Sequence, residues 1–490
     1  MLALLTACSQ VAKPPVTAVR HSPTPVPSPS LSPSLPVPAA LNWQPCGGGF
    51  QCATLTVPVD YVHPAAASVG VAMIRLPASD PAHRIGSLLT DPGGPGASGI
   101  GFVRSVAPQR MPQYRARFDI VGFDPRGGGG SQPIHCLQGA ALENYLQLDQ
   151  VPDDPIERQA LVDGNKRYDN ACQVGGGGLL TFVTAEVVAT DMEEMRMALG
   201  DPQLTYMGLS YGSLLGAVYA EMFPTHVRAL DLDGPVDPAL DLEGFIRGQA
   251  AGYLDAFNRF MAACRTADCS FNADGRGLQK LNAISSRVDR SPMKVGARPV
   301  GPGALQYALA DGVTSPRSWT GLSNALLAAQ SGDASGILFY FDTYAQRKPD
   351  GTYDNLFDAY NAVICTDRPG PASITGYDRI AADIGPANPY FGTTTVYETL
   401  PCLYWPVPPV GHAHPIKAAG APPILVVGAT HDPATPYAWA KALGSELSSG
   451  VLLTRDGDGH VSFGRSPCVD AAVAAYLVDL KVPNAGTVCA

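Results

Sequence analysis

Residues 204–212 read Leu-Thr-Tyr-Met-Gly-Leu-Ser-Tyr-Gly, and this stretch decides the fold. An apolar run of strand type leads into Ser210, and residues 213–223 have the pattern of a helix. Gly208 and Gly212 flank the serine in the pattern G-x-S-x-G, where the backbone reverses sharply and a flanking side chain would clash. Such a turn presents the serine hydroxyl above a sheet, so we predict that Ser210 is a nucleophile. The alternative is an ordinary connection between a strand and a helix.

Strands and helices alternate on both sides of this stretch. Residues 186–199 have helical periodicity, whereas residues from about 237 to 415 lose the alternation and become helical and loop-rich. This pattern predicts an α/β fold with a mostly parallel central sheet and an inserted, mainly helical cap. We expect core segments at 41–236 and 416–490, with the cap at 237–415. Strand-like runs cover residues 53–59, 69–76, 86–90, 118–123, 204–208, 227–232, 423–427 and 451–454.

A serine nucleophile needs a base, and in this fold the order along the chain is Ser, then Asp, then His. Asp432 comes directly after the predicted strand 423–427, where it would orient an imidazole. His460 follows the strand 451–454 in a Gly-rich loop. We therefore predict a catalytic triad of Ser210, Asp432 and His460. The alternatives are Asp456 and Asp458 for the acid and His431 for the base, and ordinary turn residues at all of these positions.

Acyl transfer also needs backbone N–H groups that stabilise the developing oxyanion. One candidate is the N–H of Tyr211, which directly follows the nucleophile. The other should come from the loop after an early strand, and Asp-Pro-Gly-Gly-Pro-Gly at residues 91–96 fits this position. We expect Gly94 to be the second donor, with Gly93 as the alternative.

The same loop also matches a dinucleotide-binding pattern. Residues 94–99 read Gly-Pro-Gly-Ala-Ser-Gly, which is G-x-G-x-x-G, and Asp119 or Asp124 could be the acid that binds a ribose. A nucleotide-binding oxidoreductase is therefore the main competing class. We disfavour it because prolines crowd the loop and because it leaves the Ser–Asp–His set unexplained. We expect no cofactor and no metal.

The composition of the 490-residue chain fits a globular protein with a large core, since 46% of it is hydrophobic and 16% is charged. The net charge of −10 and the lack of clustered Lys and Arg argue against nucleic acid as a partner.

Eleven cysteines indicate disulfides, although buried free thiols are the alternative. Because no C-x-x-C pair occurs, zinc-ribbon and thioredoxin-like sites are excluded. Cys8 stands apart and leaves an even number of ten. Proximity along the chain predicts three pairs and the remainder gives two more. The expected disulfides are Cys46–Cys52, Cys264–Cys269 and Cys468–Cys489, then Cys136–Cys172 and Cys365–Cys402.

The N-terminal region has the composition of a targeting segment. Residues 5–8 read Leu-Thr-Ala-Cys and resemble a bacterial lipobox, in which Cys8 would be lipidated, unless the match is accidental. The apolar stretch before Cys8 is short for a signal peptide, so we expect residues 1–8 to be a truncated one. Residues 9–40 are rich in Pro and Ser and should form an extended linker. These features predict a protein that is secreted or in the cell envelope, anchored by lipid to the outer face of the cytoplasmic membrane.

Beyond these motifs, residues 41–490 resemble the secreted tripeptidyl-aminopeptidase-like α/β-hydrolases of actinobacteria, which are related to proline iminopeptidases. The resemblance implies the same triad, and it implies that Thr435 helps to hold the acid–base pair, where a helix cap or turn hydroxyl is the alternative. The chain departs from the family at Val461, where a Gly often follows the catalytic His, and in the Gly-Gly-Gly-Gly-Ser loop after Arg126. We expect Arg126 to make a structural ion pair. The motifs that carry the resemblance are Trp43, Cys46 and Cys-Ala-Thr-Leu (52–55), Val-Pro-Val-Asp-Tyr (57–61), Pro-Gly-Gly-Pro-Gly (92–96), Phe-Asp-Ile-Val-Gly-Phe-Asp-Pro-Arg-Gly (118–127), Gly-Leu-Ser-Tyr-Gly (208–212), Asp-Gly-Pro (233–235), Asp-Pro-Ala-Thr-Pro (432–436) and Gly-His (459–460).

The resemblance implies acyl transfer on short peptides that are cut near a free N-terminus. A carboxylesterase or lipase with the same triad is the first alternative, and a non-catalytic surface-binding protein is the second. An aminopeptidase should hold the ammonium group of its substrate with carboxylates. The candidates in the predicted cap are Asp237, Asp241, Glu243 and Asp255, among which the sequence does not choose, and an ordinary solvated side chain is the favoured alternative for each.

Overall fold

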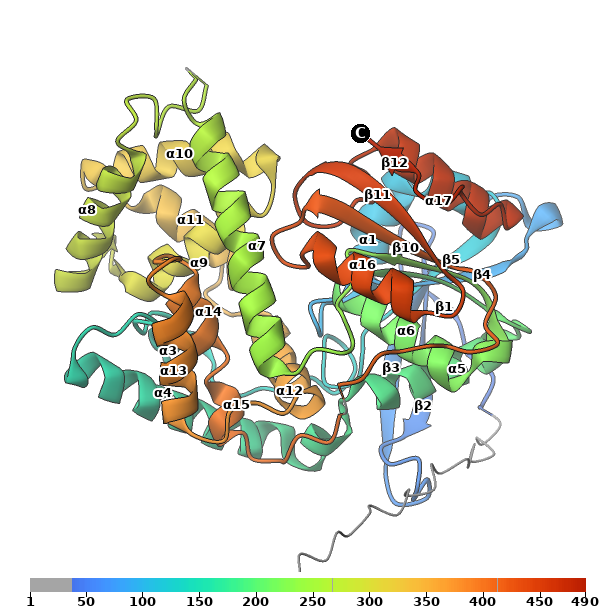
Figure 1. The fold of residues 1–490 in the computed structure, drawn as a ribbon. Helices are drawn as coiled ribbons and strands as arrows, with labels where there is room; N and C mark the ends of the chain where they lie inside the picture. Colours follow the sequence, from blue (N-terminus) through green and yellow to red (C-terminus); the bar gives the residue numbers. More distant parts are fainter. Residues whose placement is uncertain (1–37, 267, 412) are drawn as a thin grey trace, which may run out of the picture. The chain divides into compact units, whose positions relative to one another are not determined.

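A ten-stranded sheet forms the centre of the fold, with strand order β1-β2-β3-β5-β4-β6-β7-β10-β11-β12 (Figure 1). The strands from β5 to β12 in this order pair in parallel, whereas β1, β2 and β3 pair antiparallel at one edge. The prediction of a mostly parallel sheet is therefore confirmed. The strands span Gln44–Pro45 (β1), Gln51–Pro58 (β2), Ser68–Leu76 (β3), Gly86–Asp91 (β4), Phe118–Phe123 (β5), Leu204–Leu209 (β6), Val227–Asp233 (β7), Ile424–His431 (β10), Gly450–Asp458 (β11) and Val488–Cys489 (β12).

The computed structural model describes residues 38–266, 268–411 and 413–490. The predicted lipidation site Cys8, the predicted signal segment 1–8 and nearly all of the predicted linker 9–40 lie outside the described residues.

Helices cover both faces of the sheet, which explains why its central strands are buried along their whole length. Every residue of β4, β5 and β6 is buried, as expected for parallel strands. Helices α5, α6 and α16 contribute to the core on one face, and α1, α2 and α17 to the core on the other. These helices span Gly99–Arg110 (α1), Pro112–Arg115 (α2), Ala185–Leu199 (α5), Tyr211–Met222 (α6), Tyr437–Glu446 (α16) and Pro467–Asp479 (α17).

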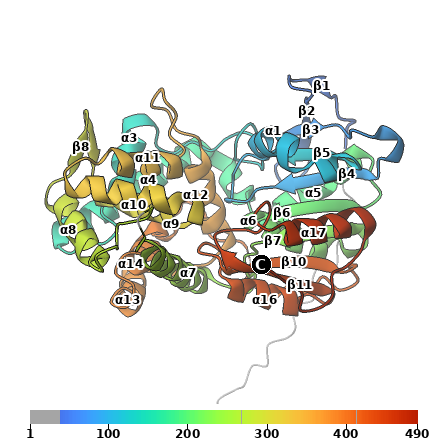
Figure 2. The same ribbon diagram turned by 90° about the horizontal axis from the view of Figure 1, so that it is seen from above.

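A helical insertion separates β7 from β10 and has its own hydrophobic core. Viewed from above, it lies beside the sheet rather than over either helix-covered face (Figure 2). The insertion contains α7 (Leu242–Ala263), α8 (Gly277–Arg290), α9 (Pro302–Val313), α10 (Pro316–Gln330), α11 (Ser335–Tyr344), α12 (Leu356–Asp367), α13 (Ile374–Ile384), α14 (Gly392–Glu398), α15 (Pro401–Tyr404) and the hairpin of β8 (Met293–Val295) and β9 (Arg298–Val300).

Two helices that precede β6 in the sequence also pack against this insertion. They are α3 (Gly139–Leu146) and α4 (Pro155–Gly176). Leu142 and Leu146 belong to the core of the insertion, and the guanidinium of Arg298 donates to Glu143 at 2.7 Å. The range 41–236, expected as core, therefore includes helices whose partners are distant in the sequence.

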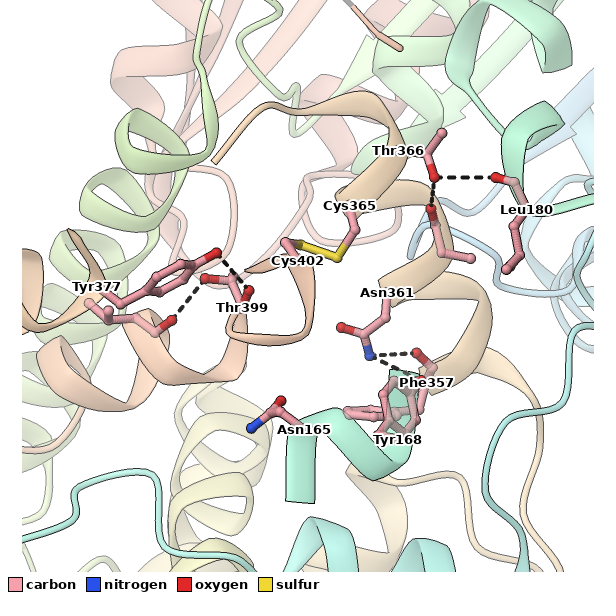
Figure 3. The surroundings of a disulfide bond; sticks show 12 residues. Asn165, Tyr168, Leu180, Phe357, Asn361, Cys365, Thr366, Tyr377, Thr399 and Cys402 are labelled. Atoms are coloured by element: carbon pink, nitrogen blue, oxygen red, sulfur yellow. Dashed lines mark hydrogen bonds between the residues drawn. A yellow bond between two sulfur atoms is a disulfide. The ribbon is translucent and has the colours of Figure 1, made fainter. Parts of the chain in front are cut away.

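Five disulfides join the ten cysteines of the described residues, and they are the five pairs expected from the sequence. One of them, Cys365–Cys402, links the end of α12 to α15 (Figure 3). Beside it, the hydroxyl of Thr366 donates to the carbonyl of Leu180 at 3.3 Å. The other four bonds are Cys46–Cys52, Cys136–Cys172, Cys264–Cys269 and Cys468–Cys489.

Within the described residues, no single helix is long and apolar enough to cross a membrane. One bent pair of segments, Pro155–Phe182 with Ala185–Leu199, meets the length and composition criteria only when its two parts are taken together.

Candidate active site

Ser210 occupies the sharp turn between β6 and α6. Its φ of 55° lies in the left-handed region, which is strained for any residue with a side chain. The turn is held because the Ser210 N–H donates to the carbonyl of Asp233, the last residue of β7, at 2.8 Å. The flanking glycines are needed for close approach: a Cβ at Gly208 would overlap the Gly212 carbonyl, and one at Gly212 would overlap the carbonyl of Asp91. This is the strand–turn–helix geometry that the motif predicts.

Asp432 and His460 come together at the ends of β10 and β11. The imidazole Nδ1 of His460 lies 2.9 Å from Oδ1 and 3.1 Å from Oδ2 of Asp432. Nε2 is therefore the ring nitrogen that is left for a nucleophile. The structure has no hydrogen bond between His460 and the hydroxyl of Ser210, although both of these described residues line one cavity. In unliganded sites such contacts are often long and tighten when substrate binds.

Burial would raise the pKa of Asp432, but the adjacent His460, its hydrogen bond and the N–H groups of Thr435 and Val461 lower this pKa overall. Burial likewise would lower the pKa of His460, but the charge of Asp432 and its hydrogen bond raise it above the ordinary value. The pair thus favours an ionised Asp432 and stabilises the protonated imidazole, as a base requires after it has accepted a proton.

The alternative acids and base have other partners. Asp456 accepts a hydrogen bond from the hydroxyl of Thr430 at 3.0 Å, and Asp458 forms an ion pair with Arg259 of α7. His431 Nδ1 lies 2.8 Å from the carboxylate of Asp255, also on α7. Among these acids, Asp432 is the one whose carboxylate contacts His460.

Thr435 contacts both members of the acid–base pair. Its N–H donates to Asp432 Oδ1 at 2.9 Å, and its hydroxyl lies 3.3 Å from His460 Nδ1. Helix α16 has Pro436 rather than Thr435 at its N-cap position. The cap alternative is therefore wrong, and the hydroxyl faces the imidazole.

The two candidate oxyanion donors lie in the wall of the same cavity. The N–H of Tyr211 is in the first turn of α6, where helical N–H groups lack a partner within the helix. The N–H of Gly93 already donates to Asp91 Oδ1 at 2.7 Å, which leaves Gly94 as the better candidate. In the described part of the chain no carbonyl or side chain accepts from the N–H of Tyr211 or Gly94.

The cavity that contains Ser210 and His460 has a volume of about 350 Å³ and lies between the sheet and the insertion. The insertion also bonds to the loop of the candidate base, because the His460 N–H donates to the carbonyl of Thr314 at 3.1 Å. Residues of the insertion that line the cavity include Phe245, Gln249, Tyr253, Asp311, Tyr344, Gln346, Phe357, Tyr360, Ile364 and Glu398.

Two of these lining residues are carboxylic acids that the sequence did not single out. The carboxylate of Glu398 accepts a hydrogen bond from the hydroxyl of Tyr344 at 2.8 Å, and burial raises its pKa to about 7. Burial also raises the pKa of Asp311 to about 6. The one available signal for Glu398 was an acid inside the apolar run Val-Tyr-Glu-Thr-Leu at 396–400.

The four carboxylates that were candidates for binding an ammonium group do not line this cavity. Asp237 accepts from the N–H of Ala239 at 2.8 Å, and Asp241 is the N-cap of α7. Glu243 forms ion pairs with Arg247 and Arg379, and Asp255 faces His431. The structure thus gives these candidates other roles, which the sequence could not distinguish because turns, helix caps and ion pairs use the same residue types as a binding site.

The dinucleotide-binding interpretation is also unsupported by the geometry. Residues 94–99 form the approach to α1, and Asp124 accepts hydrogen bonds from the Ser98 hydroxyl at 2.7 Å and the Ile100 N–H at 3.1 Å. Asp119 is engaged by Arg84 at 3.1 Å. As expected, Arg126 is structural: it is buried in an ion pair with Asp191 at 2.5 Å.

Comparisons with known proteins agree with this geometry. The family model described as "TAP-like protein" matches residues 388–489. Serine protease Hip1 of Mycobacterium tuberculosis is 36% identical over 475 residues, covering 92% of this chain and 91% of that protein. Carboxylesterase B of the same species is 37% identical over 457 residues, covering 90% and 86%. Tripeptidyl aminopeptidase of Streptomyces lividans is 29% identical over 476 residues, covering 92% and 87%. The chain is therefore a serine hydrolase and belongs to the TAP-like family of α/β-hydrolases.

Proposed function

We propose that this hydrolase removes short peptides from the free N-terminus of its substrates, with Ser210 as nucleophile, His460 as base and Asp432 as the acid that orients the base. One observation carries the choice of an N-terminal peptidase. The half-buried side chain of Glu398 lies in the wall of the cavity that also contains Ser210. A carboxylate in such a place is costly unless a cation neutralises it.

The proposed reaction proceeds through an acyl-enzyme. The hydroxyl of Ser210 transfers its proton to Nε2 of His460 as its oxygen attacks the carbonyl carbon of the scissile bond. The N–H groups of Tyr211 and Gly94 stabilise the oxyanion. His460 then donates the proton to the leaving amine, and a water molecule, deprotonated by His460, releases the acyl group from Ser210.

The carboxylates of the insertion would bind the other end of the substrate. At neutral pH the raised pKa of Glu398 keeps much of this group protonated, and a substrate ammonium beside it would lower that pKa and favour the ion pair. Asp311, in the same cavity wall, would contribute in the same way. Recognition of the ammonium at a fixed distance from Ser210 would limit cleavage to a position a few residues from the chain end.

An esterase that acts on small acyl esters is the second candidate. The three proposed catalytic residues would perform the same steps on an ester, and one of the similar proteins is named a carboxylesterase. The two functions differ in their dependence on Glu398, because an ester without an ammonium group has no cation for this carboxylate to bind.

Kinetics on matched substrates test the proposal. We expect Glu398→Gln to lower kcat/KM for a tripeptidyl amide with a free N-terminus on the order of 100-fold, the range for losing one partner of a buried ion pair. The same variant should change kcat/KM for the N-acetylated peptide amide and for a p-nitrophenyl ester by less than about threefold. If wild-type protein cleaves the esters but no amide, the peptidase proposal is wrong.

Ser210→Ala tests the mechanism separately. We expect kcat to fall by about 10⁴-fold or more on every substrate, with loss of labelling by a fluorophosphonate. Ser445→Ala, on the exposed surface of α16, is the matched control. Retained labelling in Ser210→Ala would exclude Ser210 as the nucleophile.

The five disulfides indicate that the protein folds in an oxidising compartment. We propose in addition that Cys8 carries a lipid that anchors the chain to the outer face of the cytoplasmic membrane. In cells, the full-length chain should incorporate a labelled fatty acid, and Cys8→Ala should not. Equal incorporation by the two would reject the anchor.

A further inference from the structure

Residues 458–463, called the base loop here, carry His460 from the end of β11 towards α17. The sequence of this segment suggests a flexible connection, since two glycines lie close to His460. Its backbone is nevertheless hydrogen-bonded by three buried charged groups, the proposed catalytic acid Asp432 and two others, Asp233 and Arg455, that the catalytic steps do not use.

Carboxylates accept hydrogen bonds from the N–H groups of the base loop. Both oxygens of Asp233 accept from the N–H of Ser462 at 2.9 Å, and Oδ2 also accepts from Phe463 at 2.7 Å. The N–H of Val461 donates to Asp432 Oδ2 at 2.9 Å. Asp233 is 1% exposed and lies at the end of β7, with β10 between it and β11.

A buried guanidinium donates hydrogen bonds to the carbonyls of the same loop. Nη2 of Arg455 donates to the carbonyls of Gly459 at 2.8 Å, Asp458 at 3.1 Å and Val461 at 3.3 Å. Its Nε donates to the hydroxyl of Ser462 at 3.3 Å. Arg455 is 5% exposed, so these bonds are shielded from water.

The conformation that these groups hold is one that the chain would not adopt by itself. Val461 has a φ of 56°, and a β-branched residue in the left-handed region is an outlier that persists only where its surroundings impose it. Its N–H and its carbonyl are both engaged, by Asp432 and Arg455 respectively. The strain lies one residue after His460, so the groups that bond to Val461 also act on the backbone that carries the imidazole.

Asp233 also bonds to the nucleophile turn, because its carbonyl accepts the N–H of Ser210 at 2.8 Å. We infer that Asp233 and Arg455 are positioning residues that hold the base loop against the strain at Val461 and so fix His460 relative to Ser210. This inference rests on the proposed roles of Ser210 and His460. It does not depend on whether the substrate is a peptide or an ester.

The test uses the full chain with Asp233→Asn. The asparagine amide can accept through one oxygen only, so it cannot make all three of the hydrogen bonds that the two oxygens of Asp233 accept from the N–H groups of Ser462 and Phe463. Asp231→Asn is the matched control, since Asp231 lies two residues earlier in β7, is equally buried at 1% exposed and makes no bond to the base loop. The readouts are kcat and KM for a p-nitrophenyl ester, the rate of inactivation by a fluorophosphonate, and Tm.

We expect Asp233→Asn to lower kcat and the inactivation rate 10- to 100-fold while KM changes less than threefold. Asp231→Asn should change both rates less than threefold, whatever its effect on Tm. In the Val461→Gly background the loss caused by Asp233→Asn should shrink at least fivefold, because glycine adopts the left-handed conformation without restraint. Equal losses in the Asp233 and Asp231 variants, or a loss that is the same in both backgrounds, would overturn the inference.

Arg455→Lys covers the case in which Asp233→Asn does not fold. The ammonium keeps the charge but cannot replace the planar guanidinium at three carbonyls. We expect Arg455→Lys to lower kcat with little change in KM, and we expect this loss to be at least fivefold smaller in the Val461→Gly background. A loss of the same size in both backgrounds would reject the inference. If Ser210→Ala kept the wild-type kcat and the wild-type rate of inactivation by a fluorophosphonate, the proposed function would be wrong. That outcome does not depend on how the Asp233 and Arg455 variants compare with their controls.

Discussion

The hydroxyl of Tyr211 donates a 2.7 Å hydrogen bond to the carboxylate of Asp367, which is the last residue of α12. The other oxygen of Asp367 accepts from the N–H of Ala185 at 2.9 Å, at the start of α5. The residue after the proposed nucleophile is thereby bonded to the insertion and to a helix on the face of the sheet. These bonds fix the first turn of α6, which contains a candidate oxyanion donor.

Removing this hydroxyl should weaken catalysis more than binding. We expect Tyr211→Phe to lower kcat about 10-fold with little change in KM, less than the roughly 100-fold or larger loss when an oxyanion donor itself is removed. Tyr219→Phe is the control, because Tyr219 lies on the same helix and its hydroxyl donates at 2.8 Å to Glu193, away from the cavity. Steady-state kinetics on an ester measure both variants. A similar kcat for the two would contradict a role in positioning.

The pH dependence of the reaction should distinguish esters from peptides. His460 must be neutral to act as base, and Asp432 raises its pKa above the ordinary value of 6.5, so kcat/KM for an ester should fall as the pH drops through a value above 6.5. A peptide with a free N-terminus also needs ionised Glu398, whose pKa is about 7. The fall of kcat/KM at low pH should therefore be steeper for the peptide than for the ester.

Glu398→Gln should make the acid limb for the peptide as shallow as that for the ester. Stopped assays across pH 5 to 9 would measure both profiles. A peptide profile that is unchanged by this substitution would remove Glu398 from the binding step.

The folded protein should be more stable at pH 5 than at pH 8. Burial raises the pKa of several carboxyl groups to about 7, and that of Asp169 to about 8. Between pH 5 and 8 the folded state therefore binds more protons than the unfolded state, and the free energy of unfolding falls as the pH rises. The other groups with a pKa of about 7 include Asp91, Asp358, Asp367 and Glu398.

Thermal unfolding followed by circular dichroism at the two pH values checks this direction. Asp169→Asn should reduce the difference in Tm, because neither oxygen of the buried Asp169 has a hydrogen-bond partner among the described residues. A higher Tm at pH 8 than at pH 5 would contradict the prediction.

The disulfide Cys365–Cys402 should affect activity as well as stability. Cys365 lies two residues before Asp367 on α12, so the bond restrains the turn that contacts Tyr211. We expect replacement of both cysteines by Ser to cost about 3–4 kcal/mol of unfolding free energy, from the loop that the bond closes, and to lower kcat. Replacing Cys46 and Cys52, which are only six residues apart, should cost about 2 kcal/mol and leave kcat unchanged. Equal effects on kcat would show that the first bond is only structural.

Local rules made much of the fold and of the candidate site predictable. Ser210, Asp432 and His460 each follow a strand, and the carboxyl ends of parallel strands meet at one edge of a sheet. Their order along the chain therefore predicted their proximity before any contact was known. The expected helix 186–199 and strand 227–232 agree with α5 and β7 to within one residue at each end.

Contacts between distant segments could not be predicted in this way. Glu398 lies in a helix of seven residues with no motif around it, and only the packing of the insertion brings it to the cavity. Asp233 belongs to the Asp-Gly-Pro motif at 233–235, which carries the family resemblance but does not indicate its contacts with the base loop, and Arg455 lies in no motif. Helices α3 and α4 could not be assigned to the insertion, because their partners follow more than a hundred residues later.

The hydrogen bond from the His460 N–H to the carbonyl of Thr314 has a consequence for how substrates reach the cavity. Movement of the insertion away from the sheet would break this bond and disturb the loop that orients the imidazole. The enzyme would therefore be inactive while the insertion is open. Cleavage would then require a substrate that enters while the insertion is closed. A loose chain end can thread into such an enclosure, whereas an internal loop of a folded protein cannot, and the enzyme could share a crowded compartment with intact proteins without digesting them.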